Sequence, residues 1–194
     1  MAYNRERLKE LIREKSLKFG DFTLASGKKA KYYLDGKQVV LDSEGAMLIG
    51  EGILELMIEG GVLPGDCAGG NIAIGGMAIG ADPITAAVIT IAGTRGIPLK
   101  GCMVRKETKD HGTKKFVEGP VQPGDHIVVV EDVVTTGGSS LLAIERLEAA
   151  GLIVDEVIAV IDRMEGGSDA FRNRGYKFRS LFTIEDFGIA PPRG

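Results

Sequence analysis

The sequence predicts an α/β fold: a mostly parallel twisted sheet flanked by helices, with a small N-terminal hood of one helix and short strands. Two observations predict it. Apolar runs with strand character alternate along the chain with segments of helical periodicity, and this alternation is typical of a parallel sheet with right-handed crossovers. The run at 127–130 is also an unbroken aliphatic stretch, and 154–161 is largely so, which favours strands buried on both faces of the sheet.

The first 42 residues predict the hood. Asn4 can cap a helix in which Leu8, Leu11 and Ile12 share one face. The stretch FTLASGKKAKYYLD, residues 22–35, places two short apolar or aromatic segments around a Ser-Gly-Lys-Lys turn, as in a β-hairpin. We expect residues 1–194 to form a single domain, with residues 1–42 as a hood subdomain that covers the rest.

The remaining elements follow in chain order. We expect Ser43 to cap a helix that ends at Gly60 and Gly61. A strand, a Gly-rich turn and a helix opening at Asp82-Pro83 fill 66–93. The other predicted elements are a strand at 99–104, strands at 127–130 and 154–161 separated by a helix that ends at Gly151, a short helix capped by Ser168, and a strand at 177–184.

Composition excludes several classes of protein. The chain carries 24 basic and 27 acidic side chains, a formal charge of −3, so we expect no nucleic acid partner. The charged N-terminus lacks an apolar signal region, and no stretch approaches the ~20 apolar residues of a membrane span. We therefore expect a cytoplasmic protein without a membrane partner. Cys67 and Cys102 are too few for a disulfide framework, and we expect both to be reduced core residues.

The segment IVVVEDVVTTGGSS, residues 127–140, is the most informative motif. It is a strand that runs into a loop before a helix, the place where open parallel sheets bind ligands. Gly137 and Gly138 let the main chain approach a phosphate, and the helix N-terminus favours an anion. A phosphate alone would not require two adjacent acids, whereas a ribose would, because Glu131 and Asp132 can accept from neighbouring hydroxyls. The motif therefore indicates a sugar phosphate.

In this order, these residues resemble the phosphoribosyl pyrophosphate signature of the type I phosphoribosyltransferases. The resemblance implies the fold of that family and binding of phosphoribosyl pyrophosphate (PRPP) by the motif. A P-loop is excluded because GxxxxGK[ST] is absent, and in a dinucleotide fingerprint the glycines would precede the acid. The PRPP contacts implied within the motif are Glu131, Asp132, Val133, Val134, Thr135, Thr136, Gly137, Gly138 and Ser139.

A second segment, MVRKETKDHGTKKFVEG at 103–119, is similar to the mobile catalytic loop of the orotate phosphoribosyltransferases, with its Arg-Lys-x-x-Lys-x-His-Gly run. Residues 22–35 and VIDRMEGG at 160–167 also resemble that family. The resemblance implies that Arg105, Lys106, Lys109 and His111 bind the diphosphate, and that the loop reaches into the neighbouring subunit of a homodimer. Lys114 and Lys115 lie outside the pattern, and we expect them to be surface charges.

Arg163 supplies a reason for orotate as the acceptor. Orotate differs from uracil by a carboxylate, and a guanidinium fork matches a carboxylate with two hydrogen bonds. By resemblance, Thr135 also contacts orotate. Tyr33 can pack on the pyrimidine, although an aromatic residue in a hairpin is core more often than ligand contact.

The implied reaction joins N1 of orotate to C1 of PRPP and releases pyrophosphate and orotidine 5′-monophosphate, a step of de novo pyrimidine (UMP) biosynthesis. The ribose becomes cation-like as the C1–O bond breaks, so catalysis is expected to be chiefly electrostatic. We expect Lys109 to meet the leaving pyrophosphate and Asp132 to orient the ribose. Mg²⁺ is the expected cofactor, held mainly by substrate oxygens and water without a direct protein ligand.

Two positions depart from the family pattern. Many bacterial members carry a lysine where this chain has Ala25, and another where it has Gly80. Either Lys28, Lys29 or Asn71 compensates, or the chain belongs to a branch that manages without these lysines. Three alternatives stay open: another type I phosphoribosyltransferase that uses uracil or a purine, a non-catalytic regulator that senses PRPP, and one half of a fused uridylate synthase. Turnover on orotate separates the first two from the main interpretation.

Overall fold

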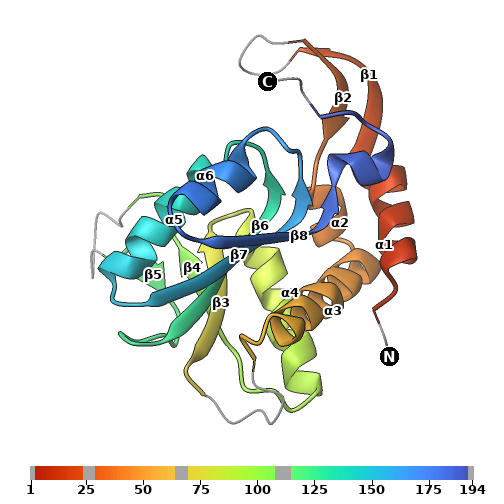
Figure 1. The fold of residues 1–194 in the computed structure, drawn as a ribbon. Helices are drawn as coiled ribbons and strands as arrows, with labels where there is room; N and C mark the ends of the chain where they lie inside the picture. Colours follow the sequence, from red (N-terminus) through yellow and green to blue (C-terminus); the bar gives the residue numbers. More distant parts are fainter. Residues whose placement is uncertain (1–2, 24–28, 64–69, 108–114, 192–194) are drawn as a thin grey trace.

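The computed structural model describes residues 3–23, 29–63, 70–107 and 115–191. Its main sheet has six strands in the order β5-β4-β3-β6-β7-β8 (Figure 1). All neighbouring strands are parallel except β5, which is antiparallel to β4, so the predicted mostly parallel α/β sheet is confirmed. The strands are β3 (Ile72–Met77), β4 (Lys100–Val104), β5 (Val117–Glu118), β6 (His126–Val134), β7 (Ile153–Asp162) and β8 (Lys177–Thr183).

Strand β6 lies inside the sheet and is buried on both faces. Val128 and Val130 join one apolar cluster, together with side chains of α3 (Ser43–Glu59) and α4 (Ala81–Thr94). Ile127 and Val129 point the other way, into a cluster with α5 (Gly138–Ala149) and α6 (Gly167–Asn173). Because side chains alternate along a strand, only an unbroken aliphatic run can fill both cores. The prediction of a strand covered on both faces is confirmed.

The N-terminal residues form a small unit beside the main sheet (Figure 1). Its two strands, β1 (Leu17–Thr23) and β2 (Lys29–Leu34), pair antiparallel as the hairpin prediction requires. Most of the predicted Ser-Gly-Lys-Lys turn lies outside the described residues. Helix α1 (Arg5–Leu11), capped by Asn4 as predicted, precedes them and continues as a π-helical turn, η1 (Ile12–Ser16). A four-residue helix, α2 (Lys37–Val40), which the sequence did not predict, leads back to the core. We call residues 3–23 and 29–42 the hood.

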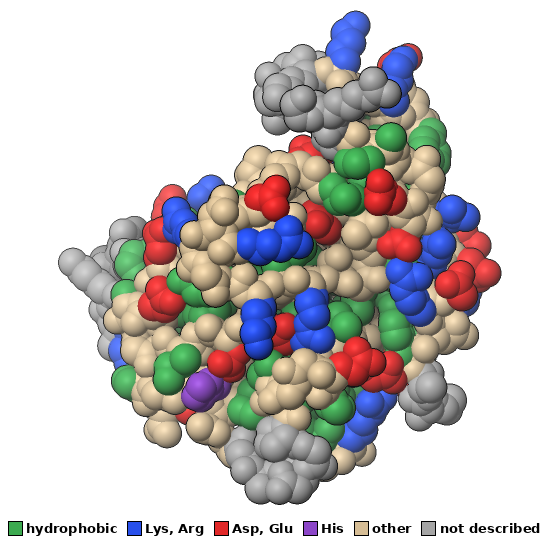
Figure 2. Space-filling view, viewed as in Figure 1, with side chains coloured by type: hydrophobic (Ala, Val, Ile, Leu, Met, Phe, Trp, Pro, Cys, Tyr) green, Lys and Arg blue, Asp and Glu red, His purple; other side chains and the backbone are tan. Residues whose placement is uncertain are grey.

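The surface mixes charges of both signs. On the face shown in Figure 2, Lys and Arg side chains are interspersed with Asp and Glu, in keeping with the formal charge of −3. Within the described parts of the chain, none of the helices has the length and apolarity needed to cross a membrane.

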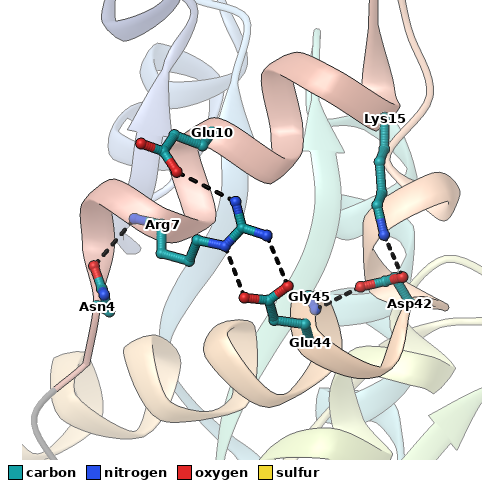
Figure 3. A network of polar contacts seen from close by, with 7 residues as sticks. All are labelled: Asn4, Arg7, Glu10, Lys15, Asp42, Glu44 and Gly45. Atoms are coloured by element: carbon teal, nitrogen blue, oxygen red, sulfur yellow. Dashed lines mark hydrogen bonds and ion pairs between the residues drawn. The ribbon is translucent and has the colours of Figure 1, made fainter.

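Ion pairs attach the hood to the start of α3 (Figure 3). Arg7 donates through Nε and Nη2 to the two carboxylate oxygens of Glu44, at 2.7 and 2.9 Å. The Lys15 ammonium donates to Asp42 Oδ2 at 2.5 Å, while Asp42 Oδ1 accepts from the Gly45 N–H at 3.0 Å. Asp42 is therefore the N-cap of α3, and the prediction of Ser43 is wrong by one residue. A carboxylate at this position also interacts favourably with the positive end of the helix dipole.

Other boundaries differ from the prediction. Helix α6 is capped by Gly166 in the left-handed region, at φ 94°, rather than by Ser168. Strand β6 continues to Val134, so the two acids of the motif lie in the strand and not in the loop after it. The segment Val117–Glu118 pairs with β4 as β5, where the sequence predicted only loop. A last 3-10 turn, η2 (Ile184–Phe187), was also not predicted.

Cys102 is buried and unbonded, as predicted, and burial raises the pKa of its thiol to about 12. Cys67 lies outside the described residues.

Candidate active site

The segment 131–140 comprises the end of β6, the loop after it and the first residues of α5, and it lines a cavity of about 370 Å³. Because β6 is parallel to both of its neighbours, this is the carboxyl edge of the sheet, where ligands bind in open α/β folds. The structure therefore brings together around one cavity the nine residues implied as PRPP contacts, and the cavity also includes Ser140, the last residue of the motif.

Glu131 and Asp132 are largely buried, at 8% and 9% exposed. Each has one oxygen held by an internal donor. The Ser140 hydroxyl donates to Glu131 Oε2 at 3.0 Å, and the Val133 N–H donates to Asp132 Oδ1 at 2.9 Å. These bonds fix the orientation of both carboxylates before any ligand arrives, which lowers the reorganisation needed on binding.

Glycines approach the acid pair from two sides. A Cβ built on Gly80, the N-cap of α4, would lie 2.9 Å from Glu131 Oε1. A Cβ built on Gly36, in the hood, would lie 2.9 Å from Asp132 Oδ2. Both separations are shorter than ordinary contact, so the missing side chains leave room for the two oxygens that the internal donors do not hold. The adjacent acids were predicted from the sequence, and Gly80 stood out there as a departure from the family pattern, whereas Gly36 gave no signal.

Burial raises the pKa of Glu131 to about 7, with the neighbouring Asp132 carboxylate as the second cause. Removal from water disfavours the charged form, and a like charge close by disfavours it further. The hydrogen bond from Ser140 acts in the opposite direction. Glu131 therefore changes its charge near neutral pH, and an arriving group that donates hydrogen bonds favours the ionised form.

The loop after the acids is built for close approach to an anion. Gly137 has φ 78°, and a Cβ there would lie 2.9 Å from the ring of Phe171. Both facts require glycine at this position. The first N–H groups of α5 follow directly, and they have no partner within the helix. The Gly167 N–H donates to the Thr135 carbonyl at 2.9 Å and ties the loop to α6.

Arg163 follows the end of β7 and lies beside the hood. Its Nε donates to the Tyr32 hydroxyl at 3.1 Å, its guanidinium carbon is 5.1 Å from the Tyr32 ring centroid, and its Nη2 is 2.7 Å from Glu165 Oε1. Tyr33 points elsewhere: it is 44% exposed, and its ring lies 5.8 Å from that of Phe22. Alternation along β2 puts the two tyrosines on opposite faces. The sequence missed the Tyr32 contact, and the predicted role of Tyr33 stays a prediction.

The second predicted segment is described only at its ends. Arg105 forms an ion pair with Glu118, its N–H donates to the Phe116 carbonyl at 2.8 Å, and its carbonyl accepts from Arg146 of α5. The Arg146 guanidinium also lies over the Phe116 ring, 4.2 Å from its centroid. Lys106 is exposed. Lys109, His111 and Lys114 lie outside the described residues, while Lys115 is exposed, as expected.

Comparison with known proteins decides the family. No protein-family model matches the chain. The orotate phosphoribosyltransferase of Rhodopirellula baltica is 51% identical over 185 residues, which cover 93% of this chain and 92% of that protein. The chain belongs to the orotate phosphoribosyltransferase family.

Solved structures agree with this assignment. The Mycobacterium tuberculosis orotate phosphoribosyltransferase in complex with Fe(III) dicitrate superposes with a TM-score of 0.81 at 34% identity, covering 95% of this chain and 99% of the other. The same enzyme in complex with PRPP gives a TM-score of 0.77 at 31% identity, with coverage of 95% and 99%. The type I phosphoribosyltransferase fold predicted from the motif is thereby confirmed.

Two departures from the family pattern have different outcomes. Gly80 borders the acid pair, so the lysine that many bacterial orotate phosphoribosyltransferases carry at this position is absent from the site itself. Ala25 and Lys28 lie outside the described residues, and Lys29 is exposed at the start of β2. Asn71 precedes β3 and accepts from the His126 N–H at 2.9 Å, at the amino edge of the sheet. The suggestion that Asn71 compensates is wrong, because it lies at the edge opposite the acids.

The described residues contain no cluster of three or more His, Cys, Asp or Glu side chains that could hold a metal ion. Two adjacent carboxylates facing a cavity fit a different arrangement, in which Mg²⁺ keeps most of its ligands from substrate and water.

Proposed function

We propose that this chain transfers the 5-phosphoribosyl group of PRPP to orotate, giving orotidine 5′-monophosphate and pyrophosphate in UMP biosynthesis. The observation that carries the proposal is the buried pair Glu131 and Asp132, each held in place by an internal donor, beside a glycine loop that opens helix α5. A ribose with two neighbouring hydroxyls and a phosphate matches this arrangement. The M. tuberculosis relative, whose structure contains PRPP, supports it.

Within the proposed site, residues 131–139 bind PRPP. Glu131 and Asp132 accept from the ribose hydroxyls, and the N–H groups and hydroxyls of 135–139 hold the 5′-phosphate at the N-terminus of α5. Val133 and Val134 belong to the β6 backbone that places these groups. The hydrogen bonds that fix the two carboxylates make this a preorganised site, in which little reorientation accompanies charge development on the ribose.

Arg163 is the proposed recognition group for the orotate carboxylate. The Arg163 Nε donates to the Tyr32 hydroxyl at 3.1 Å, and Nη2 pairs with Glu165. If the orotate carboxylate replaced Glu165 as the partner of Nη2, the guanidinium would remain paired. The Arg163 side chain is only 17% exposed, so loss of its anionic partner is costly and an acceptor without a carboxylate is disfavoured. Thr135 stays a proposed orotate contact, and Tyr33 is kept as a prediction.

Arg105, Lys106, Lys109 and His111 are proposed to bind the diphosphate. Negative charge grows on this group as the C1–O bond breaks, so a cation that meets it there stabilises the transition state more than the ground state. Lys109 is the proposed catalytic group. In the present structure Arg105 is paired with Glu118, so binding the diphosphate would require it to exchange one carboxylate partner for a phosphate.

Mg²⁺ is the proposed cofactor, and when bound it would neutralise charge on the diphosphate. Asp132 and Glu131 are the residues that would hold the assembly through the ribose hydroxyls. A homodimer that shares the loop at 103–119 across subunits and a cytoplasmic location are also proposed.

The deciding experiment is orotate-dependent consumption of PRPP in the presence of Mg²⁺, with uracil, adenine and hypoxanthine as competing acceptors. We expect turnover with orotate and with none of the other three bases. Turnover with another base would favour a different type I phosphoribosyltransferase. Binding of PRPP without turnover on any base would favour the PRPP-sensing regulator, for which the interspersed charges of Figure 2 offer no basic surface on that face.

A further inference from the structure

A hood residue, Lys37, reaches the acid pair of the active site. It is the first residue of α2, and its Nζ lies 3.8 Å from Asp132 Oδ2. The backbone brings it there, because Gly36 lies against the same oxygen closely enough that a Cβ would approach to 2.9 Å. The contact therefore depends on how the hood is seated on the core.

The acid pair has little other positive charge near it. Among the described residues, Lys37 is the one basic side chain within 4 Å of either carboxylate. Position 80, where a Cβ would lie 2.9 Å from Glu131 Oε1, has no side chain.

Lys37 is not committed to this ion pair. Its side chain is 55% exposed, and 3.8 Å is longer than a hydrogen bond. By contrast, Lys100 donates to both oxygens of the buried Asp125, at 2.8 and 2.9 Å, as a structural pair does. The Lys37 ammonium therefore keeps its donors for an incoming group.

The proposed substrate has one anion at each end of its ribose. The loop at 135–140 accounts for the 5′-phosphate, and Lys37 is not part of the cavity that this loop lines. The other anion, the diphosphate on C1, is adjacent to the hydroxyl-bearing carbons that the acid pair holds. A cation beside Asp132 but outside the 5′-phosphate loop is placed to meet that diphosphate.

We propose that Lys37 is a further substrate-binding residue, which contacts the 1-diphosphate of PRPP from the hood while Asp132 holds the ribose. This inference rests on the proposed function, because it presumes that PRPP binds in the cavity. The hood thus contributes a charge to the site that the sheet and its loops do not provide.

The test compares Lys37→Ala and Lys37→Arg with a matched hood variant, Lys31→Ala. Lys31 is 86% exposed and pairs with Asp21 at 2.5 Å on the β-hairpin. Calorimetric titration with Mg²⁺ present would measure the affinity for PRPP, inorganic pyrophosphate and orotidine 5′-monophosphate. One charge-assisted hydrogen bond corresponds to a loss of about 10-fold or more.

Lys37→Ala is expected to weaken PRPP and pyrophosphate binding by about 10-fold and to leave orotidine 5′-monophosphate unchanged, since that product lacks the diphosphate. Lys37→Arg should retain most of the affinity, and Lys31→Ala all of it. Unchanged PRPP binding, or equal weakening of PRPP and orotidine 5′-monophosphate, overturns the inference. If the unaltered protein fails to bind PRPP or to convert orotate, the proposed function itself fails, which is a separate outcome.

Discussion

Replacing Glu131 by Gln tests the electrostatics of the acid pair directly. Burial and the neighbouring Asp132 raise the Glu131 pKa from 4.5 to about 7. The folded protein therefore binds this proton more tightly than the unfolded chain does. This tighter proton binding stabilises the folded protein in full below pH 4.5, and the stabilisation is lost as the pH rises through about 7. At 1.36 kcal/mol per pKa unit, ionising Glu131 in the folded protein costs about 3 kcal/mol.

Glutamine keeps an oxygen that can accept from Ser140 and cannot ionise. The difference in unfolding free energy between Glu131→Gln and the unaltered protein should therefore shift in favour of the variant by about 2 kcal/mol from pH 5.5 to pH 8.5. This is most of the cost of about 3 kcal/mol. Urea denaturation at both pH values measures it, at one fixed protein concentration because self-association also changes apparent stability. No substrate is added.

Glu59→Gln is the matched control, because Glu59 is an exposed carboxylate at the end of α3. Its effect on stability should not change between the two pH values. If Glu131→Gln shows the same pH-independent difference, or is less stable than the unaltered protein at pH 8.5, the account of a buried, charge-repelled Glu131 is wrong. The same variant should bind PRPP more weakly, which would make Glu131 a residue retained for function at the expense of stability.

Four other changes probe the remaining parts. Lys109→Ala should lower kcat by about 100-fold or more while changing the affinity for PRPP much less, and equal losses in rapid-quench and binding measurements would contradict its role. Asp132→Asn should raise the KM for PRPP, and an unchanged KM would exclude it from ribose binding. Arg163→Lys should raise the KM for orotate by about 10-fold with that for PRPP nearly constant in steady-state assays, because an ammonium lacks the fork. Arg179→Met removes the partner of Glu156, which is 2% exposed and bonded at 2.6 and 2.8 Å. Urea denaturation should show a loss of about 3–5 kcal/mol, mostly recovered when Glu156 is also replaced by Leu.

The order of strands and helices could be predicted because each element carries its own pattern. The run 127–130 specified a strand buried on both faces, and the two apolar clusters that share β6 confirm it. Helix ends were less predictable, since neighbouring polar residues compete for the cap. Asp42 rather than Ser43 caps α3, and the same carboxylate pairs with Lys15 of the hood, a contact that no local pattern contains.

The candidate site divides in the same way. The acids and the loop are contiguous, so their order alone indicated a sugar phosphate. The groups that complete the site come from other segments: Gly80 and Gly36 beside the carboxylates, and Tyr32 on Arg163. The sequence suggested Tyr33 as the aromatic contact. The register of β2, which decides the face on which each tyrosine lies, is set by pairing with β1 and cannot be read from the residues alone.

The hood packs on the core through a shared apolar cluster that includes Leu8, Leu11 and Val39, and ion pairs are added around this contact. Arg7 and Lys15 pair with carboxylates at the start of α3, and Lys37 faces Asp132 in the site. Exposed pairs of this kind contribute little stability individually and weaken with salt. If they also set the distance between Lys37 and Asp132, moderate salt should raise the KM for PRPP more steeply in the unaltered protein than in Lys37→Ala. The seating of the hood would then act on the reaction through one ammonium group, while the acids and the 5′-phosphate loop, built on the buried strand β6, stay in place.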